Sequence, residues 1–228
     1  MGKQWDKIFR QYGKVFTKPQ EDIPKIVKLF KEKGVKRILD LGCGSGRHTV
    51  YLAKRSFDVY GFDIANEGIK ITKNWLKKEN LKAHLKICDI YKKLPYKDNF
   101  FDAIMSVQTL HHGRIGEIRK LIKEMERILK PKGLIFVTVR RALEVKGWKK
   151  NKIVIHRWKG WKKKKVKYKV IGSRIYVPIE GGEKGLIHFS FNKELIKREF
   201  KNFRVFDTWT KYGHYCLLGE LKSKNVKN

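Results

Sequence analysis

Short apolar runs alternate with longer segments in which apolar residues recur every three or four positions, a pattern typical of strands separated by amphipathic helices. The clearest helix is predicted at 116–130, where Ile118, Leu121 and Met125 fall on one face before Pro131 ends the pattern. Strands are predicted at 36–42, 57–64, 84–90, 101–107, 134–139, 203–209 and 214–221, and further helices at 22–33, 46–55, 66–79 and 192–199. Strands that alternate with helices in this way predict an α/β fold, with a mostly parallel sheet covered on both faces.

The segment 141–185 interrupts this alternation. Two stretches within it, 152–158 and 165–172, alternate like the strands of an exposed β-hairpin. Fifteen basic residues and one acid, Glu144, lie within 140–174, and aromatic side chains are interleaved among them: Trp148, Trp158, Trp161 and Tyr168. Two interpretations stay open: a nucleic-acid-binding element that uses lysines for phosphates and aromatic rings for stacking, or a solvated hairpin that packs on the sheet edge or covers the active site as a lid.

Composition adds a strongly basic balance. The 228 residues include 55 Lys and Arg against 22 Asp and Glu, for a net charge of +33. This charge indicates a polyanionic partner such as RNA, DNA or an acidic membrane surface, unless it reflects a lysine-rich composition alone. No apolar run reaches the roughly 18 residues of a membrane helix, and the first residues lack the apolar block of a signal peptide. We therefore expect a cytoplasmic protein without membrane contacts.

The three cysteines fit this compartment, because Cys43, Cys88 and Cys216 are too few for a disulfide scaffold. Neither they nor the histidines show the spacing of metal ligands, so no metal site is predicted.

A glycine-rich loop carries the strongest chemical signal. Residues 38–46 form an Asp-x-Gly-x-Gly-x-Gly pattern between a buried strand and a helix, where glycines let the backbone approach a ligand closely. About twenty residues later Asp63 ends the second strand, which is the place of a carboxylate that binds ribose hydroxyls. The spacing departs from the nicotinamide pattern G-x-G-x-x-G, and no Walker lysine follows the loop.

With these motifs the chain resembles the class I S-adenosylmethionine-dependent methyltransferases over 22–139 and 186–220. The resemblance implies a doubly wound, seven-stranded Rossmann-like sheet with S-adenosyl-L-methionine as cofactor and a basic β-hairpin inserted. It implies that Gly42, Cys43 and Gly44 receive the methionine part of the cofactor, with Asp40 beneath the loop. It also implies that Asp63 binds the ribose hydroxyls, that Asp89 bonds the adenine amino group, and that Ile64 and Ile90 lie beside the adenine. The end of the fourth strand then lines the cleft with Ser106, Val107 and Gln108.

One domain is accordingly predicted over 1–228. Its parts are an N-terminal lid or capping segment (1–21), the cofactor-binding core (22–140), the basic insertion (141–185), a C-terminal helix with two strands (186–220) and a tail (221–228).

The chemistry of such a site needs little from side chains, because the sulfonium of the cofactor already activates the methyl group. No catalytic residue is therefore assigned. Either of His111 and His112, which come after the fourth strand, is a candidate to face the substrate. Tyr12 is a candidate cleft residue, because Trp5, Phe9, Tyr12 and Phe16 recur at helical intervals in a segment that folds over the cofactor in related enzymes.

The segment after the fourth strand bears on the identity of the acceptor. The stretch SVQTLHH (106–112) lacks both the Pro-Pro-aromatic motif of exocyclic nucleobase methylation and the Pro-Cys of pyrimidine C5 methylation. The segments 46–64 and 188–209 are similar to the methyltransferase type 11 and tellurite-resistance branch, which favours a small-molecule acceptor. The paired histidines are similar to wobble-uridine tRNA methyltransferases, so the alternative is a tRNA or rRNA methyltransferase that binds RNA through 140–174. A cofactor-binding RNA module without turnover is a third hypothesis, which the intact motif from Asp40 to Asp89 disfavours.

Overall fold

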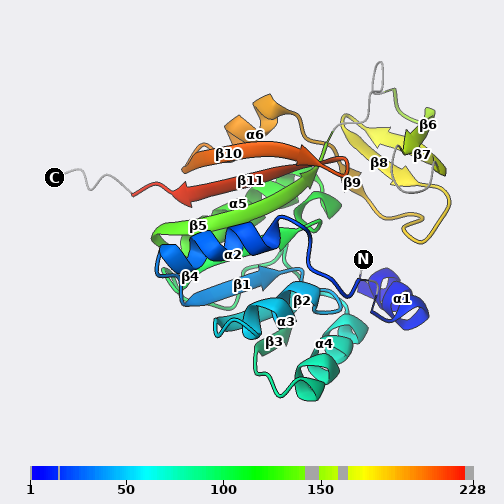
Figure 1. The fold of residues 1–228 in the computed structure, drawn as a ribbon. Coiled ribbons are helices and arrows are strands. Elements are labelled where there is room, and N and C mark those ends of the chain that lie inside the picture. Colours follow the sequence, from blue (N-terminus) through cyan, green and yellow to red (C-terminus); the bar gives the residue numbers. More distant parts are fainter. Residues whose placement is uncertain (1, 15, 142–148, 159–163, 224–228) are drawn as a thin grey trace.

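The computed structural model of the protein describes residues 2–14, 16–141, 149–158 and 164–223. Its centre is a sheet of seven strands: β1 (Arg37–Leu41), β2 (Asp58–Asp63), β3 (His84–Ile87), β4 (Phe101–Val107), β5 (Leu129–Arg140), β10 (Phe203–Lys211) and β11 (His214–Leu221). Their spatial order is β10-β11-β5-β4-β1-β2-β3 (Figure 1). The strands β1 to β5 pair in parallel, and β11 runs antiparallel to both of its neighbours. The predicted α/β fold with a mostly parallel seven-stranded sheet is confirmed.

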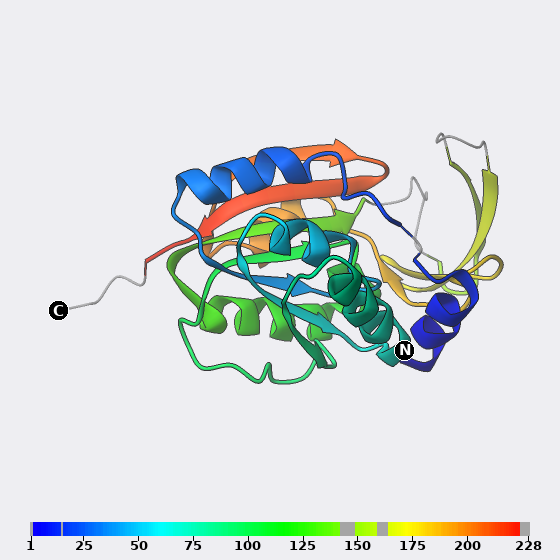
Figure 2. The same cartoon turned by 60° about the horizontal axis from the view of Figure 1, so that its bottom comes forward.

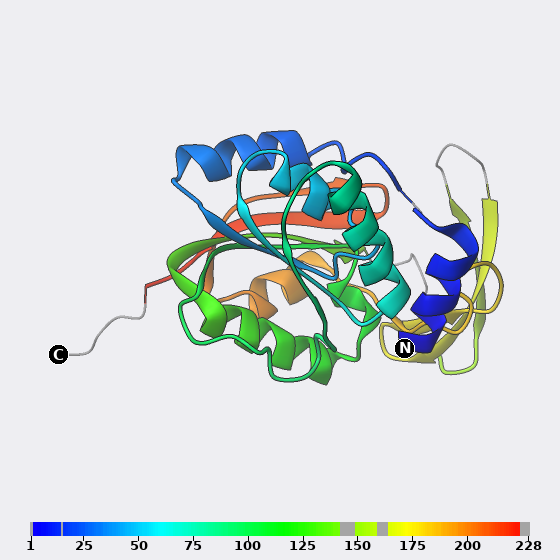
Figure 3. The ribbon, with the colours of Figure 1, turned by 90° about the horizontal axis from the view of Figure 1, so that it is seen from below.

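Helices cover both faces of this sheet, each with its own apolar core. The helices are α1 (Gly2–Tyr12), α2 (Ile23–Glu32), α3 (Arg47–Ala53), α4 (Asn66–Lys78), α5 (Ile115–Ile128) and α6 (Lys193–Glu199), with a short 3₁₀ helix η1 (Leu110–His112). Ile26 and Phe30 of α2 belong to one core, and Ile118 and Met125 of α5 to the other. Figures 2 and 3 accordingly show α2 and α5 on opposite sides of the sheet.

The basic insertion belongs to a second, smaller sheet of order β6-β7-β8-β9, formed by β6 (Ile153–Trp158), β7 (Lys164–Gly172), β8 (Ile175–Pro178) and β9 (His188–Phe189). The predicted hairpin is present as the antiparallel pair β6–β7. It is not an isolated hairpin, however, because β8 and β9 continue the sheet back to the core. Trp148 and Trp161, two of the aromatic residues interleaved with the basic ones, lie outside the described residues.

One predicted boundary was wrong in a way that the packing explains. The helix predicted at 116–130 ends at Ile128, because Leu129 already pairs with Phe101 of β4 and begins β5. The strand is therefore longer than the predicted 134–139. Among the residues that the structure describes, no helix has the length and apolar character needed to cross a bilayer.

Candidate cofactor and acceptor site

A cavity of about 530 Å³ lies at the carboxyl ends of the parallel strands, between α1 and the segment that precedes β9. This is the edge at which open α/β sheets bind ligands. Of the residues predicted for the site, those that line the cavity are Tyr12, Gly42, Cys43, Gly44, Asp63, Ile64, Asp89, Ile90, Val107, Gln108, His111 and His112. Asp40 and Ser106 do not: both are buried, Asp40 in β1 and Ser106 in β4.

The glycine loop between β1 and α3 has a shape that only glycine adopts freely. Gly42 and Gly44 have φ of +80° and +53°, in the left-handed region. A Cβ on Gly42 would lie 2.2 Å from Cγ2 of Thr109. The backbone N–H groups of Gly42 and Cys43 both donate to the carbonyl of Phe62, at 2.8 and 2.7 Å, so the loop is tied to the end of β2.

Asp63 joins this loop to the next turn. One carboxylate oxygen accepts the N–H of Gly44 and the other accepts the N–H of Ala65, both at 2.8 Å. Burial raises the pKa of Asp63 to about 6, although these backbone donors favour the ionised form. A carboxylate oxygen has two lone pairs, so each oxygen keeps one for a ligand in the cavity.

Asp40 lies outside the cavity and is 1% exposed. Its carboxylate accepts the hydroxyl of Thr49 in α3 at 2.7 Å. Burial raises its pKa from 3.8 to about 6, against the favourable effects of that hydrogen bond and of the Arg47 charge. Asp40 thus holds the start of α3, the helix that follows the glycine loop, instead of meeting a ligand.

The raised pKa of Asp40 predicts a pH-dependent stability difference for Asp40→Asn. Between pH 4 and 6 the folded protein holds a proton that the unfolded chain releases, so ionisation of Asp40 lowers the free energy of unfolding as the pH rises through this window. At 1.36 kcal/mol per pKa unit, Asp40→Asn should gain about 2 kcal/mol relative to wild type between pH 4 and pH 7.5. Urea unfolding at both pH values measures this; parallel profiles for the two proteins would contradict it.

The residues expected at the adenine follow β2 and β3. The carboxylate of Asp89 accepts the N–H of Tyr91 at 3.0 Å, which fixes the turn after β3, and Ile64 and Ile90 line the cavity beside it. Tyr91, which the sequence did not single out, also lines the cavity and donates its hydroxyl to the carbonyl of Leu110 at 3.1 Å. The end of the cavity at which the adenine is expected is thereby connected to η1.

Helix α1 closes the cavity from the side. Asp6 accepts the N–H of Glu67 at 2.9 Å and so attaches α1 to the first turn of α4. Trp5 and Phe9 line the cavity, and Trp5 lies edge-on to His112 with ring centroids 5.2 Å apart. Tyr12 lines it too but is 55% exposed, which places it at the rim.

The other end of the cavity is polar, and its side chains are buried except for Glu183, whose side chain is 51% exposed. Its polar lining comes from η1, β5, β9, β11 and the segment before β9, and consists of His111, His112, Arg140, Glu183, His188 and His214. Burial lowers the pKa of each of these histidines, of His112 to about 4 and of His214 to about 3. They are therefore neutral at pH 7. The sequence indicated only the adjacent pair, because His188 and His214 join them only through the fold.

The sequence and the structure are both similar to known methyltransferases. Residues 38–133 match a family described as a methyltransferase domain. Glycine/sarcosine/dimethylglycine N-methyltransferase from Actinopolyspora halophila is 32% identical over 108 residues, 45% of this chain and 18% of the relative. Probable tRNA methyltransferase 9B from Mus musculus is 34% identical over 104 residues, 45% of this chain and 21% of the relative. The chain thus spans less than a quarter of the length of either relative.

Among solved structures, an S-adenosylmethionine-dependent methyltransferase from Clostridium acetobutylicum has the same fold, with a TM-score of 0.66 at 15% identity. The similarity covers 98% of this chain and 93% of that one.

Proposed function

We propose that this chain, a class I methyltransferase by its fold and by the methyltransferase domain at residues 38–133, transfers the methyl group of S-adenosylmethionine to an acceptor in the buried polar end of its cavity. The methyltransferase class, the fold and S-adenosylmethionine as its cofactor agree with the sequence prediction. The acceptor that we propose is a small polar molecule.

One observation carries the proposal: the glycine loop, Asp63 and Asp89 open onto the same cavity as the histidines. The loop fits a cofactor, since Gly42, Cys43 and Gly44 line the cavity and Asp63 lines the space beside them. When bound, S-adenosylmethionine supplies a methyl group on a positively charged sulfur. The residues of the chain then bind and orient: Gly42 to Gly44 at the methionine part, Asp63 at the ribose hydroxyls and Asp89 at the adenine.

The acceptor end favours a small molecule because it is enclosed. The four histidines that line it are 2–7% exposed, Trp5 of α1 lines it from the side, and Glu183 lies at its rim with a half-exposed side chain. Holding an acceptor atom in line with the methyl group is an effect of proximity and orientation, which a buried pocket provides without a dedicated base. Exclusion of water by α1 protects the transfer from competing reactions.

Transfer of label tests the proposal directly. The protein is incubated with methyl-tritiated S-adenosylmethionine and, separately, with the small-molecule and RNA fractions of a cell extract. We expect label in the small-molecule fraction and none with Asp63→Ala. Label in RNA would instead support an RNA acceptor. If no fraction is labelled by a protein that binds the cofactor in calorimetry, the chain is a cofactor-binding module without turnover and the proposal is wrong.

A tRNA or rRNA acceptor is the second candidate, and the exposed lysines of the β6–β7 hairpin favour it. Lys167 and Lys169 are exposed on β7, in the segment where fifteen basic residues meet one acid. Tyr168, however, is 6% exposed and packs edge-on against Tyr176 with ring centroids 4.9 Å apart. It is therefore not available to stack on a base, which weakens the nucleic-acid interpretation of the insertion at this residue.

If the hairpin binds RNA, replacing Lys167 and Lys169 with alanine should weaken binding at low salt. The slope of log affinity against log salt should fall by about 0.7 for each lost contact to single-stranded RNA. Fluorescence anisotropy with tRNA across a salt series measures this. The matched control replaces Lys25 and Lys28, which are exposed on α2, away from the second sheet (Figure 1). Equal slopes for both double variants would show that any RNA binding is spread over the whole charged surface.

A further inference from the structure

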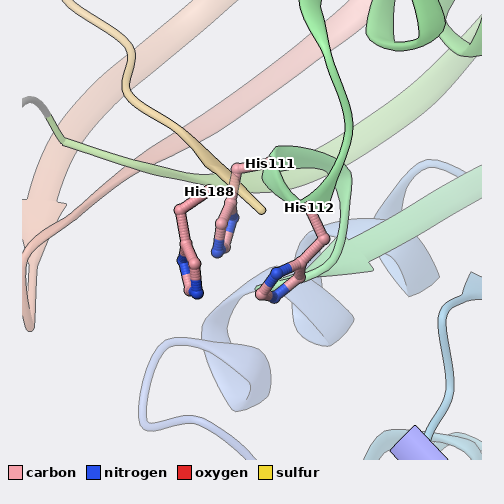
Figure 4. Close-up of side chains that lie close together, drawn as sticks. All are labelled: His111, His112 and His188. Carbon is pink, nitrogen blue, oxygen red and sulfur yellow. The ribbon is translucent and has the colours of Figure 1, made fainter. Parts of the chain in front are cut away.

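Three histidines at the acceptor end lie within ligand distance of one another. His111 and His112 come from η1 and His188 from β9, and one ring nitrogen from each lies within 4.8 Å of the others. Figure 4 shows the three rings approaching one another from two segments of the chain. Among the described residues this is the group whose ligand atoms are close enough to hold a metal ion.

Some ring nitrogens of these histidines make no hydrogen bond to the described residues. Nδ1 of His111 and both ring nitrogens of His188 are buried without a hydrogen-bond partner in the described part of the chain. A buried polar atom left unpaired is destabilising, so such atoms usually mark an ion or an ordered water. His112 differs, because its Nδ1 lies 3.3 Å from the carbonyl of Ile187. The ring of His112 also makes a hydrogen bond to the backbone of Gln108. A neutral imidazole carries a single N–H, so in the tautomer that donates from Nδ1 to Ile187 the lone pair of Nε2 is left for a metal ion.

Two charged side chains near the three histidines have opposite effects on a bound cation: Arg140 repels it and Glu183 attracts it. Arg140 opposes a cation, since its charge contributes to the lowered pKa of His111, His112 and His188, for which burial is the larger cause. Glu183 offsets it: Oε2 of Glu183 lies 3.4 Å from Nε2 of His188. Arg140 is itself engaged, because its Nε donates to the hydroxyl of Tyr176 at 3.1 Å.

We propose that His111, His112 and His188 bind one divalent transition-metal ion, with Zn²⁺ as the reference ion, at the acceptor end of the cavity. Imidazole nitrogens suit zinc and its neighbours, and three protein ligands leave a fourth position for a water or substrate atom. All three histidines line the cavity, so that position faces the space where the acceptor binds. The prediction of no metal site rested on spacing along the chain, which does not detect ligands from η1 and β9.

The role of the ion rests on the proposed methyl transfer, whereas the binding itself does not. A metal ion lowers the pKa of a coordinated hydroxyl or thiol, which then reacts at neutral pH. The O–H or S–H bond of the acceptor breaks, and its proton passes to a solvent base. The electron pair left on oxygen or sulfur forms the bond to the methyl carbon, and the pair of the broken C–S bond leaves with S-adenosylhomocysteine. The acceptor class that fits is thus a small alcohol, phenol or thiol.

Metal binding by the full-length, untagged chain tests the site without activity. Equilibrium dialysis against ZnCl₂ followed by metal analysis should give one Zn²⁺ per wild-type chain. His188→Gln and His112→Gln should each bind at least tenfold more weakly. The matched control is His84→Gln, because His84 is an exposed histidine on β3 that stacks on Tyr60, far from the cluster in the sheet order. Loading with Co²⁺ adds a second readout, the visible absorption of a low-coordinate cobalt site, which His188→Gln should abolish.

The outcomes separate this proposal from the proposed function. Circular dichroism of His188→Gln should match that of wild type, which shows that the variant is folded. If wild type binds the cofactor but no Zn²⁺ or Co²⁺, the metal site is wrong and the methyltransferase assignment stands. Zinc binding that survives both glutamine variants likewise overturns the site. Zinc binding lost in both, with no label transferred to any acceptor, would support the site and contradict the transfer.

Discussion

Gly42→Ala is expected to abolish measurable cofactor binding and to destabilise the protein. The backbone at Gly42 has φ of +80°, and an added Cβ would lie 2.2 Å from Cγ2 and 2.3 Å from Oγ1 of Thr109. A left-handed conformation costs a non-glycine residue about 1–3 kcal/mol, and the clash adds to this because Thr109 is held by the turn into η1. Either the loop or Thr109 must move, and the loop is the proposed seat of the methionine part.

We expect the affinity for S-adenosylmethionine in calorimetry to fall at least a hundredfold, which corresponds to about 2.7 kcal/mol. Gly34→Ala is the matched control. Gly34 also has a positive φ, +68°, but no atom lies within 4 Å of its added Cβ. This variant carries the backbone strain without the clash, so it should lose some stability in urea unfolding and keep its cofactor affinity. Wild-type affinity for Gly42→Ala would show that the loop does not receive the cofactor.

Asp63→Ala should weaken cofactor binding about a hundredfold as well, for a different reason. The variant removes the acceptor proposed for two ribose hydroxyls, and hydrogen bonds to a charged group contribute about 1.5–3 kcal/mol each. It also leaves the N–H groups of Gly44 and Ala65 without their acceptor, so the loop loses one of its hydrogen bonds to the end of β2 and keeps those to the carbonyl of Phe62.

Two further variants separate these effects. Asp63→Asn keeps an oxygen that can accept one backbone N–H, and should fold better than Asp63→Ala while still binding the cofactor weakly. Asp58→Ala removes an acid from the other end of β2, where Asp58 pairs with Arg37 at 2.8 Å, and should leave cofactor affinity unchanged. If Asp63→Ala bound S-adenosylmethionine as well as Asp58→Ala does, the assignment of the ribose site would be wrong.

The local sequence pattern was sufficient to predict most strands and helices of the core, and to predict that the glycine loop, Asp63 and Asp89 lie at one cavity. The strand predicted at 101–107 is β4 to the residue, because a buried parallel strand is a continuous apolar run with clear turn residues on either side. The glycine loop, Asp63 and Asp89 all follow strand ends directly, so their meeting at one edge follows from the topology. The positions of these residues are set by the strands that directly precede them in the sequence.

The residues of the proposed acceptor end are brought together by contacts between distant segments, which no local sequence pattern predicts. His188 and His214 come from different sheets, and they meet the η1 pair only once β9 and β11 are in place. The strand β8 was missed because it is four residues long, and its Tyr176, which is fully buried, looks like any aromatic residue of a loop in the sequence. Burial of Tyr168, likewise, is not visible in a sequence where it alternates with lysines.

Thr109 has a consequence for the order of events at the site. Its hydroxyl donates to the carbonyl of Gly42 at 3.3 Å, and two residues later the chain presents His111. Thr109, which contacts the proposed cofactor loop, and His111, at the proposed acceptor end, therefore belong to the same short segment of backbone. By thermodynamic linkage, a cofactor that stabilises this arrangement raises the affinity for an acceptor by the same factor as the acceptor raises the affinity for the cofactor. The enzyme should then follow a sequential mechanism, in which cofactor and acceptor are both bound before the methyl group is transferred.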